Sequence, residues 1–316
     1  MNKIELKNKL CNCFTADACV EVYLGIKDRG FKKARFEKDV QKVLKTIFQK
    51  ELDEKLLNNE DVNLIPYSSY EDRTKDWAEY DLDMPENLNF FEELMRINEV
   101  QNFSFEDDGL DNIESMVIVI GNAKSRVGIY KRVAKINIYT KNTGLFVRKG
   151  DNGFVTGNIN FLRITNGIDM VKIADSLIIA NLSILEKYFN ITDIIFKAAN
   201  KEINSIAELD IINDTTKLIE LTGDIRYARK LTKISEVSPV IKKGITSAQI
   251  KKFVTSTKHP LMSSLRFDEK DRICLNSKKS AKVFIKLLND DYLLSELTDA
   301  YYDSAVKEEL YKAVEQ

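Results

Sequence analysis

The hydrophobic and polar positions of the N-terminal part predict a strand followed by a helix. Residues 20–26 alternate (V-E-V-Y-L-G-I), as is typical of a strand with one buried face, and Gly30 lies in the turn that follows. Between Phe36 and Asn58, apolar residues recur every three or four positions, with lysines on the opposite face. This spacing predicts an amphipathic helix.

The middle of the chain has the pattern of short strands. Met116–Gly121 is continuously apolar, as expected of a strand covered on both faces, and residues 132–140 alternate. Short apolar runs flank K-G-D-N-G at 149–153, which favours a hairpin because Asn-Gly tolerates positive φ. Further short runs between 161 and 181 complete a predicted, largely antiparallel sheet.

After Leu182 the periodicity becomes helical. One helix is predicted over 216–234, and another begins after Ser277, a residue type that favours helix N-caps. The predicted fold class is therefore α+β, in three regions. These are a mixed N-terminal region (1–115), a β-rich central region (116–190) and a helical C-terminal region (191–316).

Charge is strongly segregated, although the 316 residues carry a formal net charge of only −1. Residues 51–115 hold 20 acidic and 4 basic side chains, residues 116–150 hold 8 basic and no acidic ones, and residues 216–286 hold 17 basic and 6 acidic ones. Two interpretations remain open. The acidic segment pairs with the basic ones inside the fold, or the basic segments share a face that binds a polyanion.

Several classes of site are excluded or lack support. No G-x-x-x-x-G-K-[ST], G-x-G-x-x-G or G-x-S-x-G motif occurs, and the four cysteines do not have zinc-ribbon spacing. The single histidine, His259, directly precedes Pro260, which predicts an exposed loop residue and not a catalytic one. We therefore predict no catalytic residue, no metal ligand and no cofactor.

A divergent metal-dependent nuclease remains the enzymatic alternative. Its acidic residues would be Asp169, Asp175 or the pair Asp290 and Asp291. The pattern is weak because the strand predicted after Asp175 carries no acid, and adjacent acids in a helix point about 100° apart.

Basic side chains are the main candidates for a surface that binds a polyanion. In the predicted helix 216–234, four of them recur at three, four and seven positions and would form one stripe. A lysine pair follows Ser277 in a first helical turn, where backbone N–H groups bind phosphate. A third group lies in the central region. In order of preference, the candidates are Arg226, Arg229, Lys230 and Lys233, then Lys278 and Lys279, then Arg126, Lys131 and Arg132.

No apolar run approaches the length of about 20 residues that a membrane span needs. The N-terminus, MNKIELKNKL, has no apolar core of a signal peptide. We therefore expect a cytoplasmic protein without direct membrane insertion.

Two stretches resemble a known family. LFVRKGDNGFVTGNINFLRITNGIDMVKIADSLIIANLSILEKYF (145–189) and LLNDDYLLSELTDAYYD (287–303) are similar to the KwaB family of the two-gene Kiwa antiphage defence system of bacteria. The likeness extends from about Val20 to the C-terminus. The family offers no catalytic motif to transfer to this chain.

The resemblance implies an effector that binds phage double-stranded DNA without cutting it and blocks replication or late expression. It also implies a homodimer that a membrane-spanning partner, KwaA, recruits to the cytoplasmic face of the inner membrane. The acidic segment 51–115 would then be a docking surface or a mask over the basic face. A protein-interaction module with no nucleic-acid role remains the other alternative.

Overall fold

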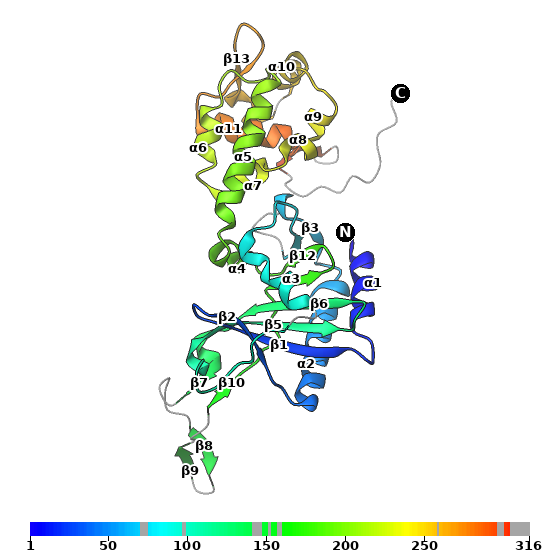
Figure 1. The fold of residues 1–316 in the computed structure, drawn as a ribbon. Coiled ribbons are helices and arrows are strands. Elements are labelled where there is room, and N and C mark those ends of the chain that lie inside the picture. The colour runs from blue at the N-terminus through cyan, green and yellow to red at the C-terminus, as the bar shows by residue number, and fades with distance from the viewer. Residues whose placement is uncertain are drawn as a thin grey trace. The chain divides into compact units, whose positions relative to one another are not determined.

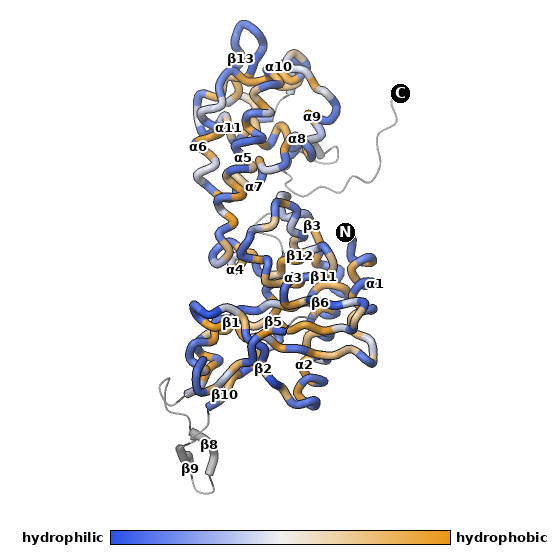
Figure 2. The backbone as a smooth tube through the Cα atoms, viewed as in Figure 1, coloured by the Kyte–Doolittle hydropathy of each residue, from blue (hydrophilic) through white to orange (hydrophobic). Residues whose placement is uncertain are grey.

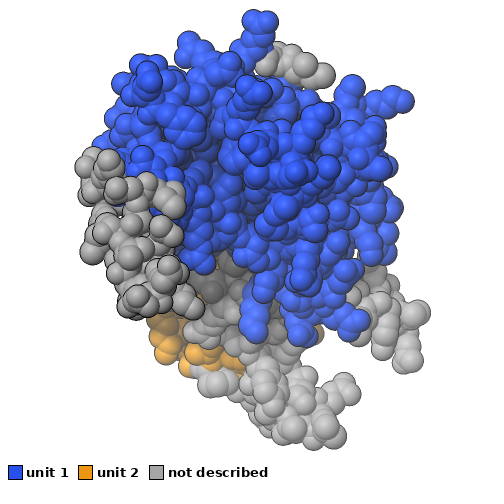
Figure 3. Space-filling view, turned by 90° about the horizontal axis from the view of Figure 1, so that it is seen from below, with its two compact units in different colours: residues 1–67, 75–191 blue, residues 68–74, 192–316 orange. Residues whose placement is uncertain are grey.

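The structure is a computed structural model of the 316-residue chain. It describes residues 1–69, 75–96, 99–140, 147–150, 153–156, 160–257, 259–295 and 300–303. The chain divides into two compact units, which Figure 3 shows in blue and orange. Unit 1 comprises residues 1–67 and 75–191, and unit 2 comprises residues 68–74 and 192–316.

Unit 1 is built on an eight-stranded sheet with the strand order β2-β1-β5-β6-β11-β12-β4-β3 (Figure 1). All neighbouring pairs are antiparallel except β3 and β4. Its strands are β1 (Cys19–Ile26), β2 (Gly30–Ala34), β3 (Leu64–Pro66), β4 (Trp77–Glu79), β5 (Ile113–Gly121), β6 (Arg126–Arg132), β11 (Met170–Ile173) and β12 (Ser176–Ile179). Two small sheets pair β7 (Ile138–Tyr139) with β10 (Phe161–Leu162), and β8 (Val147–Gly150) with β9 (Gly153–Thr156).

Helices cover both faces of the large sheet. On one face α1 (Lys3–Cys13) and α2 (Lys38–Leu52), which continues as the π-helical turn η1 (Asp53–Leu57), pack Leu6 and Phe48 into the same core as Ile118. On the other face α3 (Phe90–Met95) lies against β6 at Gly128, where an added Cβ would make a tight contact of 3.1 Å with the Met95 sulfur. Figure 2 shows the apolar character of the central strands between these layers. The remaining helical elements of this unit are η3 (Glu86–Leu88), η4 (Leu110–Asn112), η5 (Lys135–Asn137) and α4 (Leu182–Tyr188). The turn η2 (Tyr67–Ser69) begins at the last residue of segment 1–67 and continues into segment 68–74, which is assigned to unit 2.

The outer edge of β2 is covered by the chain that precedes β5. The Lys33 amide donates to the carbonyl of Gln101, and the Phe103 amide donates to the carbonyl of Lys33, each at 2.8 Å. Lys33 and Asn102 thereby form an isolated parallel bridge. The backbone groups of this part of β2 are therefore already paired.

Unit 2 is largely helical. Its core includes buried side chains of several helices, among them Ile203 of α5, Leu218 of α6 and Phe284 of α11. Its elements are α5 (Ile191–Glu208), α6 (Thr216–Leu221), α7 (Ile225–Leu231), α8 (Ile234–Val237), α9 (Pro239–Lys242), α10 (Ser247–Ser256), η6 (Pro260–Ser264), β13 (Arg266–Phe267), β14 (Ile273–Cys274), α11 (Lys278–Leu288), β15 (Tyr292–Ser295) and β16 (Ala300–Asp303).

The α+β fold class is confirmed, with a largely antiparallel sheet and a helical C-terminal part. The first strand, the long N-terminal helix, the buried strand before Gly121 and the hairpin of β8 and β9 are also found. The turn between β8 and β9, at residues 151 and 152, lies outside the described residues.

The single helix predicted over 216–234 is wrong, because this stretch forms three short helices, α6, α7 and α8. The first break falls at Gly223, a weak helix former, and at Asp224, whose carboxylate caps α7 by accepting from the Arg226 amide at 3.1 Å. The second break falls between Leu231 and Ile234.

Two further predictions are wrong. Residues 132–140 do not form one strand, since β6 ends at Arg132 and η5 precedes the short β7. His259 was predicted to be exposed, but it is buried. Its Nδ1 accepts from the Leu261 amide at 3.2 Å and so caps η6, and its ring packs edge-on to Tyr292.

Candidate nucleic-acid interface

The helix α11 presents a row of lysines. Ser277 caps it, accepting from the Ser280 amide at 3.1 Å, and Phe284 and Ile285 on its inner face are buried. Lysines at spacings of three, four and eight residues lie on one side of a helix. Lys278 and Lys279 are exposed, whereas Lys282 and Lys286 are half-buried. We call this row the α11 lysine stripe, and it consists of Lys278, Lys279, Lys282 and Lys286.

A cation–π contact connects the stripe to α7. The Lys282 Nζ lies 4.8 Å from the centroid of the Tyr227 ring, so both helices contribute to one surface of unit 2. On α7 the Arg226 side chain is 63% exposed. Its guanidinium forms a two-bond pair with the Asp224 carboxylate at 3.0 and 2.6 Å, and this pairing lowers the pKa of Asp224. Arg226 therefore adds a partly compensated charge to the surface that carries the α11 lysine stripe.

The other candidates from the same stretch differ in accessibility. Arg229 is 1% exposed and belongs to the core of unit 2. Lys230 lies on α7 one turn after Arg226 and is half-buried, while Lys233 precedes α8 and is also half-buried. The predicted stripe of four residues is thus not formed, because Arg229 points inward and Lys233 lies beyond the end of α7.

The candidates of the central region are engaged within unit 1. Arg126 pairs with Glu21 at 3.1 Å and donates to the Met95 carbonyl at 3.3 Å. Lys131 is buried, which lowers the pKa of its ammonium group, and its Nζ donates to the carbonyl of Thr165 at 2.6 Å.

Arg132 is also engaged, pairing with Glu114 at 3.2 Å while its guanidinium lies 4.1 Å from the centroid of the Tyr188 ring. The nearby Lys135 donates to the carbonyl of Asp111. Glu114 and Asp111 both belong to the acidic segment 51–115. In this part of the central region, the basic side chains therefore pair with the acidic segment inside the fold.

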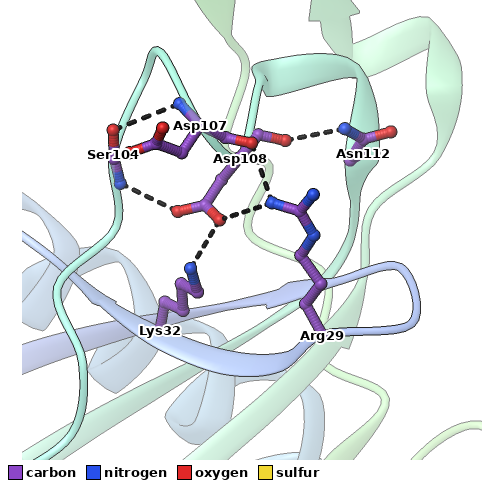
Figure 4. A network of polar contacts seen from close by, with 6 residues as sticks. All are labelled: Arg29, Lys32, Ser104, Asp107, Asp108 and Asn112. Atoms are coloured by element: carbon purple, nitrogen blue, oxygen red, sulfur yellow. Dashed lines mark hydrogen bonds and ion pairs between the residues drawn. The ribbon is translucent and has the colours of Figure 1, made fainter.

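A further example of such pairing surrounds Asp108 (Figure 4). This carboxylate is fully buried and accepts from the Lys32 Nζ at 2.6 Å, from the Ser104 amide at 2.9 Å and, at 3.5 Å, from Arg29. Arg29 also donates to the carbonyl of Asp107 at 2.8 Å. The network ties the turn and strand after β1 to the loop before β5.

This network makes the stability of unit 1 depend on pH. The hydrogen bond from Lys32 holds the pKa of Asp108 below its usual range. A carboxyl with a lowered folded pKa stabilises the fold above its unfolded pKa of about 3.9 and ceases to do so as the pH falls through the folded value. At neutral pH we expect the urea concentration at the unfolding midpoint to be higher for the wild type than for Asp108→Asn. This difference should shrink as the pH falls below about 4.

Asp107→Asn is the matched control for this titration, since the Asp107 side chain is exposed. Its urea midpoint should follow that of the wild type at every pH. A constant difference between wild type and Asp108→Asn would contradict the role given to the ionised carboxylate.

The acidic residues proposed for a nuclease do not converge. Both oxygens of Asp169 are used, by the Arg132 amide at 2.6 Å and the Asn181 side chain at 2.9 Å. Asp175 is exposed in the turn at the other end of β11. Asp290 is exposed directly after α11, whereas Asp291 is buried. Among the residues that the structure describes, no group of three or more His, Cys, Asp or Glu could hold a metal ion.

Sequence reasoning missed part of this interface. Lys282 and Lys286 complete the row that Lys278 begins, and their spacing of four residues was the available signal. The contact between Lys282 and Tyr227 joins residues 55 positions apart in the chain, which periodicity cannot indicate.

The comparisons with known proteins are consistent with one another. A profile of the family described as "Kiwa protein KwaB-like" matches residues 110–298. The chain is 27% identical over 315 residues to "Kiwa protein KwaB" of Escherichia coli O55:H7 (strain RM12579 / EPEC), covering 98% of this chain and 99% of that protein. No solved structure is detectably similar. Within the described residues, no helix has the length and apolarity that crossing a membrane requires.

Proposed function

Since this chain belongs to the Kiwa protein KwaB-like family and so has a role in the Kiwa antiphage defence system, we propose that it acts there by binding phage double-stranded DNA. It binds without cutting and blocks replication or late expression. It works as a homodimer at the cytoplasmic face of the inner membrane, recruited by the membrane-spanning partner KwaA.

The observation that carries the proposal is the α11 lysine stripe. Lys278, Lys282 and Lys286 span about 12 Å of helix axis, the length of three to four base pairs at roughly 3.4 Å each. A row of ammonium groups on this scale suits contacts along a phosphate backbone. Arg226 and Lys230 on α7 extend the same surface. Such contacts fix position and strength without reading sequence.

The central region contributes less in this proposal. Arg126, Lys131 and Arg132 are paired or buried in unit 1, and Arg229 is part of the core of unit 2. We therefore assign DNA contacts to Lys278, Lys279, Lys282 and Lys286, with Arg226, Lys230 and Lys233 at the margin.

DNA affinity measured against salt concentration tests the proposal. For Lys278→Ala/Lys279→Ala/Lys282→Ala we expect at least about tenfold weaker binding at low salt. The log–log salt slope should become shallower by roughly 0.9 for each phosphate that the variant no longer neutralises. Fluorescence anisotropy with a duplex of unrelated sequence provides the measurement.

The matched control is Lys242→Ala/Lys243→Ala/Lys252→Ala, which removes three exposed lysines of unit 2, two at the end of α9 and one in α10. Its salt slope should remain close to that of the wild type. An equal loss of affinity in both triple variants would mean that net charge matters and the α11 lysine stripe does not. Plasmid incubated with Mg²⁺ or Mn²⁺ should remain intact.

A further inference from the structure

An aromatic ring stands exposed on the loop that precedes β5. Phe105 is 74% exposed, although its neighbour Phe103 is half-buried against the core of unit 1. The two rings meet edge-on, with centroids 5.2 Å apart. Exposed aromatic side chains held in one orientation are frequent anchors of protein–protein interfaces.

The loop that carries Phe105 is held by hydrogen bonds within the loop and by a bond to β2. The Asp108 amide donates to the Ser104 carbonyl at 3.0 Å, and the Asp107 amide donates to the Ser104 hydroxyl at 3.2 Å. The buried Asp108 carboxylate then joins this loop to Lys32 of β2 (Figure 4). We call residues 104–108 the Phe105 loop. Because its backbone is already ordered, little conformational entropy is lost when a partner binds it.

The charges beside the ring are negative and uncompensated. Glu106 and Asp107 are exposed, and the part of the chain that the structure describes provides no ion-pair partner for either carboxylate. The two cations of the neighbouring network have other acceptors, since Arg29 donates to the Asp107 carbonyl and Lys32 to the Asp108 carboxylate. A partner that binds Phe105 in an apolar pocket therefore binds most tightly when Lys or Arg side chains edge that pocket.

A second apolar side chain is attached to the same stretch. Ile136 of η5 is 75% exposed. Its neighbour Lys135 donates to the Asp111 carbonyl, and the Thr140 hydroxyl donates to the Asp111 carboxylate at 2.9 Å. The loop of Phe105 is anchored through Asp108, and the segment of Ile136 is anchored through Asp111.

We propose that the Phe105 loop is the docking site for the membrane-spanning partner, which binds it through an apolar pocket edged by basic side chains. The proposal rests on the function proposed above. Cytoplasmic loops of membrane proteins carry an excess of Lys and Arg, which complements Glu106 and Asp107. The same two carboxylates disfavour an anionic lipid surface as the occupant.

Co-purification tests the docking site. The full-length chain is co-expressed with the membrane-spanning component of the same two-gene system and captured in detergent through a tag on that component. We expect Phe105→Ser to reduce the captured amount at least about tenfold, as is typical of a central aromatic anchor. The control Phe253→Ser, which changes another exposed phenylalanine (47%), should be captured like the wild type.

Charge reversal gives an independent test. Glu106→Lys/Asp107→Lys should also abolish capture, whereas Glu60→Lys/Asp61→Lys, which reverses two adjacent exposed acids elsewhere in the acidic segment, should not. Thermal unfolding and DNA affinity of Phe105→Ser should equal those of the wild type. Docking and DNA binding can therefore fail separately.

Four outcomes would overturn the proposal. Unchanged capture of Phe105→Ser would show that the partner binds elsewhere, and a wild-type chain that is not captured would show that the named occupant is wrong. Binding of the chain alone to anionic phosphatidylserine vesicles that disappears in Phe105→Ser would assign the loop to lipid. A change in oligomeric state of Phe105→Ser by analytical ultracentrifugation would assign it to a second copy of this chain.

Discussion

Arg229→Ala should lower the free energy of unfolding of unit 2 by about 3 kcal/mol, the range for removing a buried charged residue from its partners. Arg229 is 1% exposed and is among the largest fully buried side chains of the described residues. Truncation to alanine leaves a cavity where this buried side chain lies. Hydrogen exchange of peptides from α5, α7 and α11 measures this destabilisation, with peptides from unit 1 as the internal reference.

Arg226→Ala is the matched control, because the same residue type lies one turn away with its side chain 63% exposed. Its effect on stability should stay below about 1 kcal/mol, since exposed ion pairs such as that with Asp224 contribute little. Its effect should instead appear as weaker DNA binding. An Arg229→Ala variant that is as stable as the wild type but binds DNA more weakly would contradict the structural role assigned to Arg229.

Gly121→Ala should destabilise unit 1 by about 3 kcal/mol or more. Gly121 ends β5 with φ at 150°, and a Cβ there would lie 2.1 Å from the Ser125 carbonyl oxygen and 2.8 Å from the Arg126 Cα. Both clashes involve backbone of the turn between β5 and β6, in which the Asn122 amide donates to the Ser125 carbonyl at 3.0 Å. The two central strands cannot relieve the clash without breaking their pairing.

The chain has one tryptophan, Trp77, and it is buried in β4 of unit 1. Its fluorescence during urea unfolding therefore reports on the unit that contains Gly121. Gly167→Ala is the control, because nothing lies within 4 Å of a Cβ at that position. Equal unfolding midpoints for the two variants would refute the steric explanation.

The spacing of apolar residues correctly predicted the elements whose structure depends on neighbouring residues in the sequence. Alternation identified β1, three-and-four spacing identified α2, and continuous apolarity identified β5 as buried on both faces. The same spacing rule failed over 216–234, because one long helix and three short ones can share a periodicity. Only the propensities of Gly223 and Asp224 distinguish them, and tertiary packing decides the outcome.

The candidate site was harder to predict because exposure of a basic residue depends on distant partners. Lys131 finds its acceptor at Thr165, 34 positions later, and Arg132 finds Glu114, 18 positions earlier. The charge pattern indicated that acidic and basic segments could pair, but it does not identify these individual partners. The lysines of α11 differ because the apolar face of the helix fixes the side on which they lie, and that face could be read from Phe284 and Ile285.

The segregated charges of the sequence therefore have two different outcomes. In unit 1, acidic residues such as Glu114 and Asp108 pair with basic ones within the unit. In unit 2, the α11 lysine stripe lies opposite the buried apolar face of its helix. The proposed DNA contacts and the proposed docking loop consequently occupy separate units, and each can be altered without the other.

The pairing of Lys33 with residues 101–103 has a consequence for how this protein behaves at high concentration. An open sheet edge is a template on which another chain can add a strand, and such additions lead to aggregates. At β2 the backbone groups of Lys33 are already hydrogen-bonded, and the opposite edge strand, β3, ends in Pro66, which has no N–H to donate. Fibrillar growth from either edge of the large sheet is thereby opposed, and copies of the folded chain are expected to meet through side-chain surfaces.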